Sequence, residues 1–407
     1  MRTAELEPAV LVGLCTSRGK YERDLTSLDE LSLLATSASF DPKAQLLYKK
    51  DRIDPACFIG RGQAHELKGT AAEHGAGVII FDFELSPVQV RNVEKIVERR
   101  VITRTELILA IFKSRAHTRE AQLQVELAML MYSLPRLRHM WTHLNRIEGY
   151  IGSRGPGEKQ IELDKRRIAK RIDKIKKDLV AVKTHRMVLR KGREHRRKAA
   201  LVGYTNAGKS SLLNTLAHTA LYTEDRLFST LDPATREVWL GDGMTASVTD
   251  TVGFIKRLPH TLIASFRATL EEVGDADLLI HVADISAPEP LERIEAVEEV
   301  LREIGADHLP VVNVFNKVDL LASRDMKASL LSRFENRVVV SAKTGEGIQE
   351  LKACLLGFFK GTLLPKTPFS ETMFPGAKQP GARLAESRLD RSAPGASSLD
   401  HAPTVRG

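Results

Sequence analysis

The nine residues GYTNAGKSS, Gly203 to Ser211, restrict the fold of this chain more than any other stretch of its 407 residues. They carry the spacing G-x-x-x-x-G-K-[ST], which is typical of a loop whose backbone N–H groups and lysine surround a phosphate. The apolar KAALV before the loop indicates a strand, and SSLLNTLAH indicates a helix after it. This order predicts an α/β domain with a mostly parallel sheet and helices on both faces.

Each residue of this loop has an expected place at the phosphates of a nucleotide. Lys209 would bridge the β- and γ-phosphates, and the hydroxyl of Ser210 would ligate Mg²⁺. The N-terminus of the following helix would add its partial positive charge at the same anion. The expected phosphate-binding residues of the loop are Gly203, Tyr204, Thr205, Asn206, Ala207, Gly208, Lys209 and Ser210.

The segment DTVGF supplies a second set of groups for the phosphates. Asp250 would hold Mg²⁺ through its shell of waters, and the backbone N–H of Gly253 would meet the γ-phosphate. Thr251 and Val252, which lie between them, are also expected at the phosphates. Lys209 and Gly253 are therefore two of the expected catalytic residues.

The tetrapeptide NKVD and the tripeptide SAK decide which base is bound. Asp319 only accepts hydrogen bonds, so it requires a base edge with two adjacent donors, which guanine has and adenine lacks. The N–H of Ala342 can donate to guanine O6, but in adenine it would face the amino group, which is also a donor. Buried groups left unpaired in this way discriminate strongly between the two bases. The expected guanine-binding residues are Asn316, Lys317, Val318, Asp319, Ser341, Ala342 and Lys343. The predicted ligand is GTP or GDP.

The segment LFSTLDPATR lies between the phosphate loop and Asp250. Thr230 is the candidate that closes over Mg²⁺ and the γ-phosphate when GTP is present, and it is the third expected catalytic residue. The alternative is an ordinary turn that contains serine and threonine. The expected phosphate-binding residues of this segment are Phe228, Ser229, Thr230, Leu231 and Asp232.

The residue after Gly253 predicts slow hydrolysis. Many GTPases have there a glutamine that orients the attacking water, whereas this chain has Phe254. We therefore expect slow turnover in the isolated protein and stimulation by a partner. Asn206 could compensate by helping to hold K⁺ near the developing negative charge, or it could only form hydrogen bonds within the loop.

The chain divides into four parts by pattern: a small α/β domain at 1–112, a basic helical segment at 113–197, the G domain at 198–360 and a tail at 361–407. The tail is rich in Pro, Gly and Ser, and its composition predicts disorder. Two apolar stripes in the second part predict an antiparallel hairpin in which the first helix stops at Pro135. The alternative is that both stripes pack on a neighbouring domain. The stripes are Leu123, Leu127, Leu130 and Leu134, and Ile168, Ile172, Ile175, Leu179, Val182 and Leu189.

Charge is concentrated in one place. The chain has a formal net charge of +9, and the 35 residues 164–198 hold 16 Lys and Arg against 4 Asp and Glu, so the rest of the chain sums to −3. Such a segment predicts binding to a polyanion.

No apolar stretch is long enough for a transmembrane span, the first residues have no signal core, and the three cysteines have no metal-binding spacing, so a cytoplasmic protein is expected.

Several blocks together resemble one family, the HflX-type GTPases, over about residues 9–360. The most specific is RGPGEKQIELDKRR, Arg154 to Arg167, and QVELAMLMYSLPRL, TRTELILAIF, FDFELSPVQ, LFSTLDPATR and DTVGFI also look like family blocks. One departure is IEGYIGSRG, where the family tends to have a glycine-rich run and where Glu148 adds a negative charge near the expected RNA-facing tip.

The resemblance implies a GTPase that binds the large (50S) ribosomal subunit and splits or rescues stalled ribosomes under stress. We further expect a monomer with no stable membrane insertion. The hairpin would reach ribosomal RNA, neutralising phosphates with little base specificity. Trp141 and Tyr150 could stack on bases, although Trp141 could equally pack between the helices. The RNA-contact candidates are Arg154, Gly155, Gly157, Lys165, Arg166, Arg167, Lys170 and Arg171.

Other functions stay open at the level of the sequence. One is an RNA-binding scaffold whose GTP site is structural, and another is a GTPase for tRNA modification, although no cofactor fingerprint supports it. Binding of the basic helix to anionic lipids is a third, disfavoured because its apolar positions form a narrow seam. The sequence does not decide between splitting, rescue and assembly of ribosomes, and it shows no motif for a second nucleotide in the first domain.

Overall fold

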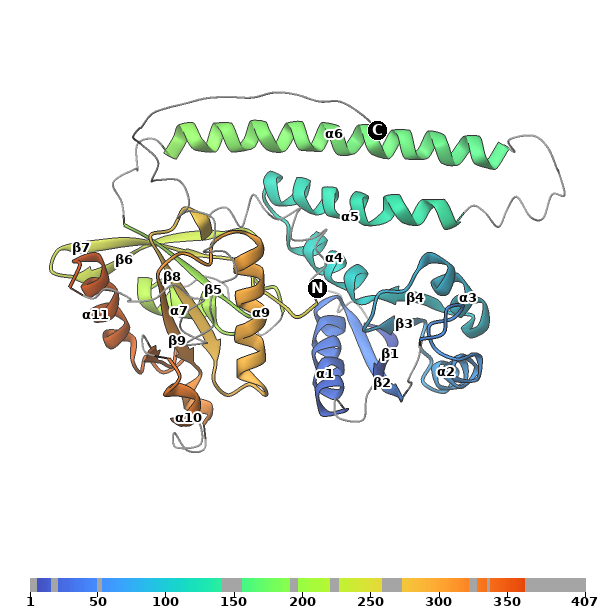
Figure 1. Cartoon of the computed structure of the whole chain (residues 1–407), viewed down its shortest axis with the longest axis horizontal. Helices are drawn as coiled ribbons and strands as arrows, with labels where there is room; N and C mark the ends of the chain where they lie inside the picture. Colours follow the sequence, from blue (N-terminus) through green and yellow to red (C-terminus); the bar gives the residue numbers. More distant parts are fainter. Residues whose placement is uncertain are drawn as a thin grey trace, which may run out of the picture.

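The computed structural model describes residues 6–15, 21–49, 53–140, 156–190, 197–219, 227–257, 273–321, 328–334 and 337–362. Figure 1 shows two α/β domains side by side, with two long helices, α5 and α6, lying along them. None of the helices in the described ranges is long and apolar enough to cross a membrane.

The N-terminal α/β domain is a four-stranded parallel sheet in the order β2-β1-β3-β4. Its elements are β1 (Glu7–Cys15), α1 (Tyr21–Ser37), β2 (Phe40–Lys49), α2 (Arg61–Glu73), β3 (Val78–Phe81), α3 (Pro87–Val97), β4 (Arg100–Thr103) and α4 (Arg104–Arg115). Strand β1 is buried on both faces, because Val10 and Val12 pack with α2 and α3 while Ala9 and Leu11 pack with α1 and α4. Helix α3 starts as the sequence predicts, with the Ser86 hydroxyl accepting from Gln89 N at 3.3 Å.

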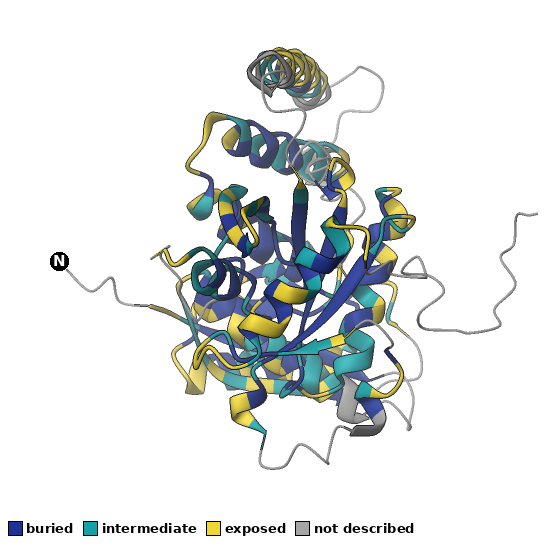
Figure 2. Ribbon diagram, turned by 90° about the vertical axis from the view of Figure 1, so that its left-hand side faces the viewer, coloured by how far each residue is buried: buried dark blue, intermediate teal, exposed yellow. Residues whose placement is uncertain are grey.

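Helices α5 (Arg119–Met140) and α6 (Pro156–Arg190) form the predicted hairpin. Leu123 and Leu127 of one helix bury against Ile172 and Ile175 of the other, so the two apolar stripes meet each other rather than a neighbouring domain. Figure 2 shows α6 nearly end-on, standing above the rest of the molecule with α5 beneath it.

The prediction that the first helix stops at Pro135 is wrong, because α5 continues through this proline to Met140. A proline inside a helix removes a hydrogen bond and costs about 3 kcal/mol. Tertiary contacts on both sides of it hold the helix. Tyr132 hydroxyl lies 2.8 Å from Thr103 Oγ1, and Arg136 donates to Glu84 at 3.0 Å.

The G domain is a six-stranded sheet in the order β10-β9-β8-β5-β7-β6, parallel except for the edge strand β6. Its elements are β5 (Lys198–Gly203), α7 (Lys209–Ala217), β6 (Ala234–Gly241), β7 (Met244–Asp250), β8 (Leu278–Asp284), α9 (Pro290–Glu303), β9 (Val311–Asn316), the 3₁₀ helix η3 (Val318–Leu320), α10 (Ala328–Leu331), β10 (Arg337–Val339) and α11 (Ile348–Phe359). Helices α7 and α11 cover one face and α9 covers the other, as the α/β prediction requires. The carboxyl ends of β5, β7, β8 and β9 therefore meet at one edge, where open α/β sheets bind ligands.

The core of the N-terminal domain continues into the G domain. Phe112 of α4 meets the ring of Phe228 edge-on, with the ring centroids 4.7 Å apart. The amide N–H of Leu227 donates to the Ser37 hydroxyl at 3.2 Å. The two domains thus contact each other at the segment that includes Thr230.

Candidate nucleotide site

The phosphate loop runs from the end of β5 at Gly203 to the start of α7 at Lys209. Gly208 has a φ of +90°, and a Cβ there would lie 2.3 Å from the side-chain nitrogen of Asn316. That nitrogen donates to the carbonyl of Ala207 at 2.9 Å. Only glycine fits at position 208, and the hydrogen bond from the Asn316 side chain stabilises the loop next to it.

Lys209 lies inside the loop, and only 5% of it is exposed. Its ammonium donates to the carbonyls of Gly203 at 3.1 Å and Tyr204 at 2.9 Å. Burial lowers the pKa of Lys209 to about 8, and the nearby charge of Asp250 opposes this shift. A phosphate beside the ammonium would stabilise its charged form further.

The three residues expected around Mg²⁺ lie together. Ser210 Oγ donates to Asp250 Oδ2 at 2.6 Å, Thr230 Oγ1 donates to the same oxygen at 2.9 Å, and the two hydroxyls are 2.7 Å apart. Burial raises the pKa of Asp250, and the ammonium of Lys209 partly opposes the rise. Asp250 Oδ1 is buried and finds no hydrogen-bond partner among the described residues.

A small polar cavity of about 40 Å³ lies in front of the loop. Most of its lining consists of residues expected at the phosphates, and Ser211 is an addition that the sequence did not single out. The lining residues are Thr205, Asn206, Gly208, Lys209, Ser210, Ser211, Phe228, Ser229, Thr230, Thr251 and Gly253. Asn206 has a φ of +59° and an exposed side chain.

Gly253 lies directly against the phosphate loop. A Cβ there would be 2.8 Å from Thr205 Cα and 3.0 Å from Lys209 Nζ. The next residue, Phe254, is hydrogen-bonded to the loop on both sides, through Thr205 N to Phe254 O at 2.7 Å and Phe254 N to Gly203 O at 3.1 Å. The expected γ-phosphate ligand and the loop lysine therefore face each other.

Two expected phosphate-binding side chains point elsewhere. The carboxylate of Asp232 accepts from the backbone N–H groups of His117 and Thr118 at 3.1 and 3.2 Å and from the Thr118 hydroxyl, just before α5. A carboxylate repels phosphate, so these donors are its better partners. The side chain of Tyr204 also leaves the cavity and enters the interface with the N-terminal domain. Leu231 and Val252 are buried among apolar side chains.

The residues expected at the base lie at the ends of β9 and β10. Ser341 Oγ donates to Asp319 Oδ1 at 2.6 Å, which orients the carboxylate. The N–H of Ala342, expected at guanine O6, donates to Asn316 Oδ1 at 2.9 Å in this structure, so a base would have to share it. Lys317 pairs with Asp284 at 2.9 Å. Val318 is buried and Lys343 is exposed.

Comparison with known proteins places the chain among GTPases. It is 47% identical to the GTPase HflX of Magnetococcus marinus over 327 residues, which are 80% of this chain and 76% of that protein. It is 42% identical to the GTPase HflX of Escherichia coli K12 over 370 residues, 89% of this chain and 85% of that protein. The chain belongs to the HflX family of GTPases.

Three family models match successive parts of this HflX-family chain. Residues 25–113 match the family described as GTP-binding GTPase N-terminal, and residues 115–193 the GTP-binding GTPase middle region. Residues 198–317 match the family described as 50S ribosome-binding GTPase. The structure is also similar to a GTP-binding protein of the archaeon Sulfolobus solfataricus in complex with GDP, with 22% identity, a TM-score of 0.47, and coverage of 88% of this chain and 100% of that one.

Phe254 is buried in the core of the G domain, with 2% of it exposed. Its side chain packs among apolar side chains and is not among the residues that line the cavity. Among the described residues that line the cavity, none carries a carboxylate, an imidazole or a glutamine amide.

The RNA-contact candidates lie on or before α6. Gly157 is in its first turn, and Arg154 and Gly155 lie outside the described residues, as do Trp141, Glu148 and Tyr150. The side chains of Arg166, Arg167, Lys170 and Arg171 are exposed and that of Lys165 is half-buried. Arg171 binds Glu126 of α5 through two hydrogen bonds of 2.6 and 2.7 Å, so it joins the two helices.

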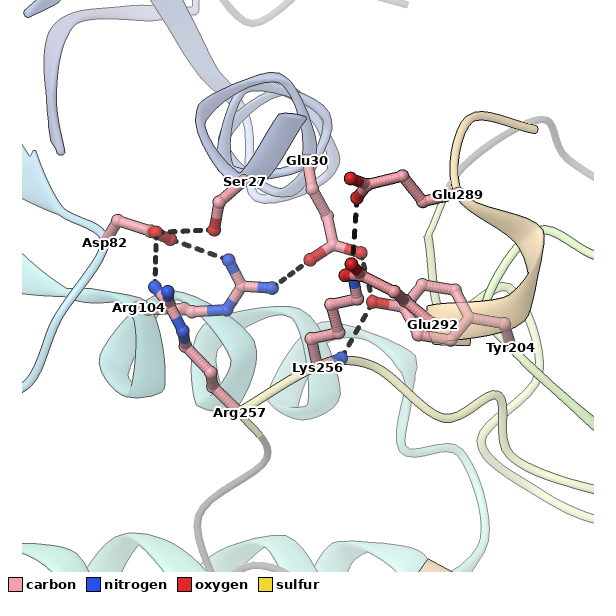
Figure 3. Close-up of polar contacts among 9 residues, drawn as sticks. All are labelled: Ser27, Glu30, Asp82, Arg104, Tyr204, Lys256, Arg257, Glu289 and Glu292. Atoms are coloured by element: carbon pink, nitrogen blue, oxygen red, sulfur yellow. Dashed lines mark hydrogen bonds and ion pairs between the residues drawn. The ribbon is translucent and has the colours of Figure 1, made fainter. Parts of the chain in front are cut away.

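Sequence reasoning missed a polar network between the two domains (Figure 3). It joins α1, the end of β3 and the start of α4 with the phosphate loop and the residues after Phe254. Its members are Ser27, Glu30, Asp82, Arg104, Tyr204, Lys256, Arg257, Glu289 and Glu292. The cross-domain partners are up to 175 residues apart in the sequence, so no local pattern could have found them.

Proposed function

We propose that this protein hydrolyses GTP with Mg²⁺ on the large ribosomal subunit, slowly alone and faster when bound, and that it acts in splitting or rescuing ribosomes under stress. The observation that carries the ribosomal part is the match of residues 198–317 to the 50S ribosome-binding GTPase family. The exposed cations of α6 support it, because they suit a phosphate backbone. A cytoplasmic, monomeric protein is part of the same proposal.

Mg²⁺ fits the residues at the phosphate cavity. The hydroxyls of Ser210 and Thr230 and the carboxylate of Asp250 are oxygen donors of the kind that Mg²⁺ prefers. The buried Asp250 Oδ1 could bind a water of the metal. Bound Mg²⁺ would neutralise charge on the β- and γ-phosphates, while Lys209 and the N–H of Gly253 orient the γ-phosphate.

The proposed division of labour follows the four sequence segments. Residues 198–360 would bind and hydrolyse GTP, with guanine held by Asp319 and its neighbours. Residues 1–112 and 113–197 would bind the ribosome. The RNA phosphates would be contacted by Lys165, Arg166, Arg167 and Lys170.

GTP turnover in the presence of purified large ribosomal subunits tests the proposal. We expect stimulation of at least about tenfold, because a partner can supply the groups that orient water or stabilise charge. Small subunits are the control. A variant lacking residues 1–197 should lose co-sedimentation with the large subunit, and unchanged co-sedimentation would overturn the proposed role of that segment. Stimulation by tRNA or free RNA alone would favour the scaffold or tRNA-modification alternative.

We also propose that Asn206 helps to hold K⁺ beside the phosphates. Asn206 lines the cavity and is exposed, and its amide makes no hydrogen bond among the described residues. GTP turnover should be about tenfold faster in KCl than in NaCl at equal ionic strength, since a fixed cation stabilises the developing charge. The variant N206A should be equally slow in both salts. Equal rates for the unaltered protein would exclude K⁺ from this role.

A further inference from the structure

Segment 227–232 of the G domain is held at both ends by residues of other parts of the chain. At its start, the amide N–H of Leu227 donates to the Ser37 hydroxyl of α1 at 3.2 Å. The ring of Phe228 meets that of Phe112 of α4 edge-on, with the centroids 4.7 Å apart. Phe228 has a φ of +55°, which a bulky residue keeps only where its surroundings hold it. The start of the segment therefore rests on the N-terminal domain.

The end of the segment is fixed to the residues just before α5. Asp232 accepts from the backbone N–H groups of His117 and Thr118 at 3.1 and 3.2 Å, and from the Thr118 hydroxyl. The same hydroxyl accepts from the N–H of Ala121 at 3.2 Å, so Thr118 caps the first turn of α5. Three charge-assisted hydrogen bonds at a helix N-terminus hold a carboxylate firmly. Asp232 thus joins the segment to the base of the hairpin.

Thr230 lies between these two anchors and beside the expected metal ligands. Its hydroxyl is 2.7 Å from Ser210 Oγ, and both hydroxyls donate to Asp250 Oδ2. Two oxygens that ligate one Mg²⁺ side by side, each at about 2.1 Å, lie about 3 Å apart. The anchored position of Thr230 therefore suits the sharing of one ion with Ser210.

The G domain itself holds the segment through few hydrogen bonds. Within the described ranges, every hydrogen bond between segment 227–232 and the rest of the G domain comes from the Thr230 hydroxyl. One hydroxyl fixes one point, so the direction of the backbone on either side of it depends on the anchors. Ordering such a segment costs free energy, and contacts that order it before binding spare the ligand that cost.

We propose that Asp232, with Thr118 and Ser37 as its partners outside the G domain, is a positioning residue that holds Thr230 at the Mg²⁺ site and so strengthens the binding of GTP with Mg²⁺. The inference rests on the GTP site proposed above. GDP, or GTP without Mg²⁺, would bind without this contribution, because Thr230 is expected to close over Mg²⁺ and the γ-phosphate together.

The variant Asp232→Ala removes the anchor at the end of the segment. In titrations of the full chain with a non-hydrolysable GTP analogue, the affinity in the presence of Mg²⁺ should fall about tenfold, because hydrogen bonds to a charged group are lost. The affinity for the analogue in EDTA, and that for GDP with Mg²⁺, should each change by less than about twofold. This dependence on both Mg²⁺ and the γ-phosphate separates positioning from a general loss of structure.

The partners of the anchors should show the same pattern with smaller effects. Ser37→Ala removes the acceptor of the Leu227 N–H and should weaken binding of the analogue with Mg²⁺ about threefold. Thr118→Val should do the same, whereas Thr118→Ser keeps the hydroxyl and should restore the original affinity. The matched control is Asp242→Ala, an exposed carboxylate of the same domain that pairs with Lys360, and it should leave all three affinities within about twofold.

A double variant shows whether Asp232 acts through Thr230. Thr230→Ala alone should weaken binding of the analogue with Mg²⁺ at least as much as Asp232→Ala does. Adding Asp232→Ala to it should then cause no further loss, because effects that pass through one group do not add.

Three results would overturn the positioning role while leaving the GTP site in place. They are an unchanged affinity of Asp232→Ala for the analogue with Mg²⁺, an equal loss of affinity for GDP, and full additivity with Thr230→Ala. Failure of the unaltered chain to bind either nucleotide would overturn the GTP site and the positioning role together.

Discussion

Replacing Lys209 with methionine is expected to reduce kcat/KM for GTP by at least about 10³-fold. Lys209 is the buried cation of the phosphate cavity, and its ammonium lies where β- and γ-phosphate oxygens would be bound. In the variant, the negative charge that develops on these oxygens would no longer be stabilised by the ammonium, and water does not replace that donor in a buried site. Methionine is an unbranched, uncharged side chain only slightly shorter than lysine, so the effect reports the loss of the ammonium. Phosphate release in single turnover measures it.

The control is Lys360→Met, which removes an exposed lysine paired with Asp242 at 2.5 Å in the same domain. Its kcat/KM should stay within about twofold, since exposed ion pairs contribute little. Thermal unfolding of the Lys209 variant checks that the fold is kept, because the removed ammonium also donates to the carbonyls of Gly203 and Tyr204. A loss of turnover smaller than tenfold would show that Lys209 does not hold the transferred phosphate.

The parts of the fold that the sequence predicted are those encoded by contiguous residues. The strand, loop and helix around Gly203–Lys209 follow one another along the chain, so a local motif describes their geometry. The hairpin was also predictable, since two stripes of matching period can bury each other. The same holds for the start of α3, where Ser86 and Pro87 stand side by side.

The sequence did not predict features that depend on tertiary partners. Helix α5 passes Pro135 because Tyr132 and Arg136 are anchored on the N-terminal domain, and no local propensity reports such anchors. Asp232 lies in a segment expected at the phosphates, yet its partners are His117 and Thr118, just before α5. Tyr204 is a second example. Its position in the motif predicts where its backbone lies, but not that its hydroxyl binds Glu30 of the N-terminal domain.

A second large effect is expected at the base. Replacing Asp319 with asparagine should reduce the affinity for GTP by at least about 100-fold and make XTP the preferred nucleotide. In the proposed site the carboxylate would accept from the two donors of guanine, N1–H and the 2-amino group, whereas an asparagine amide would set its N–H₂ against the 2-amino group. Xanthine has a carbonyl at that position, which accepts from the amide. Competition titrations with GDP and XDP, followed by turnover of GTP and XTP, measure the exchange.

The change in base preference requires that the side chain at position 319 keep its orientation. Ser341 would hold it, because its hydroxyl can donate to an amide oxygen as it does to Asp319 Oδ1. The matched control is Asp242→Asn, an exposed carboxylate of the same domain, which should leave the preference for GTP unchanged. ITP, which lacks the 2-amino group, should bind the unaltered protein more weakly than GTP by about tenfold. If Asp319→Asn still prefers GTP over XTP, the base is read by other groups, and the shared N–H of Ala342 becomes the first to examine.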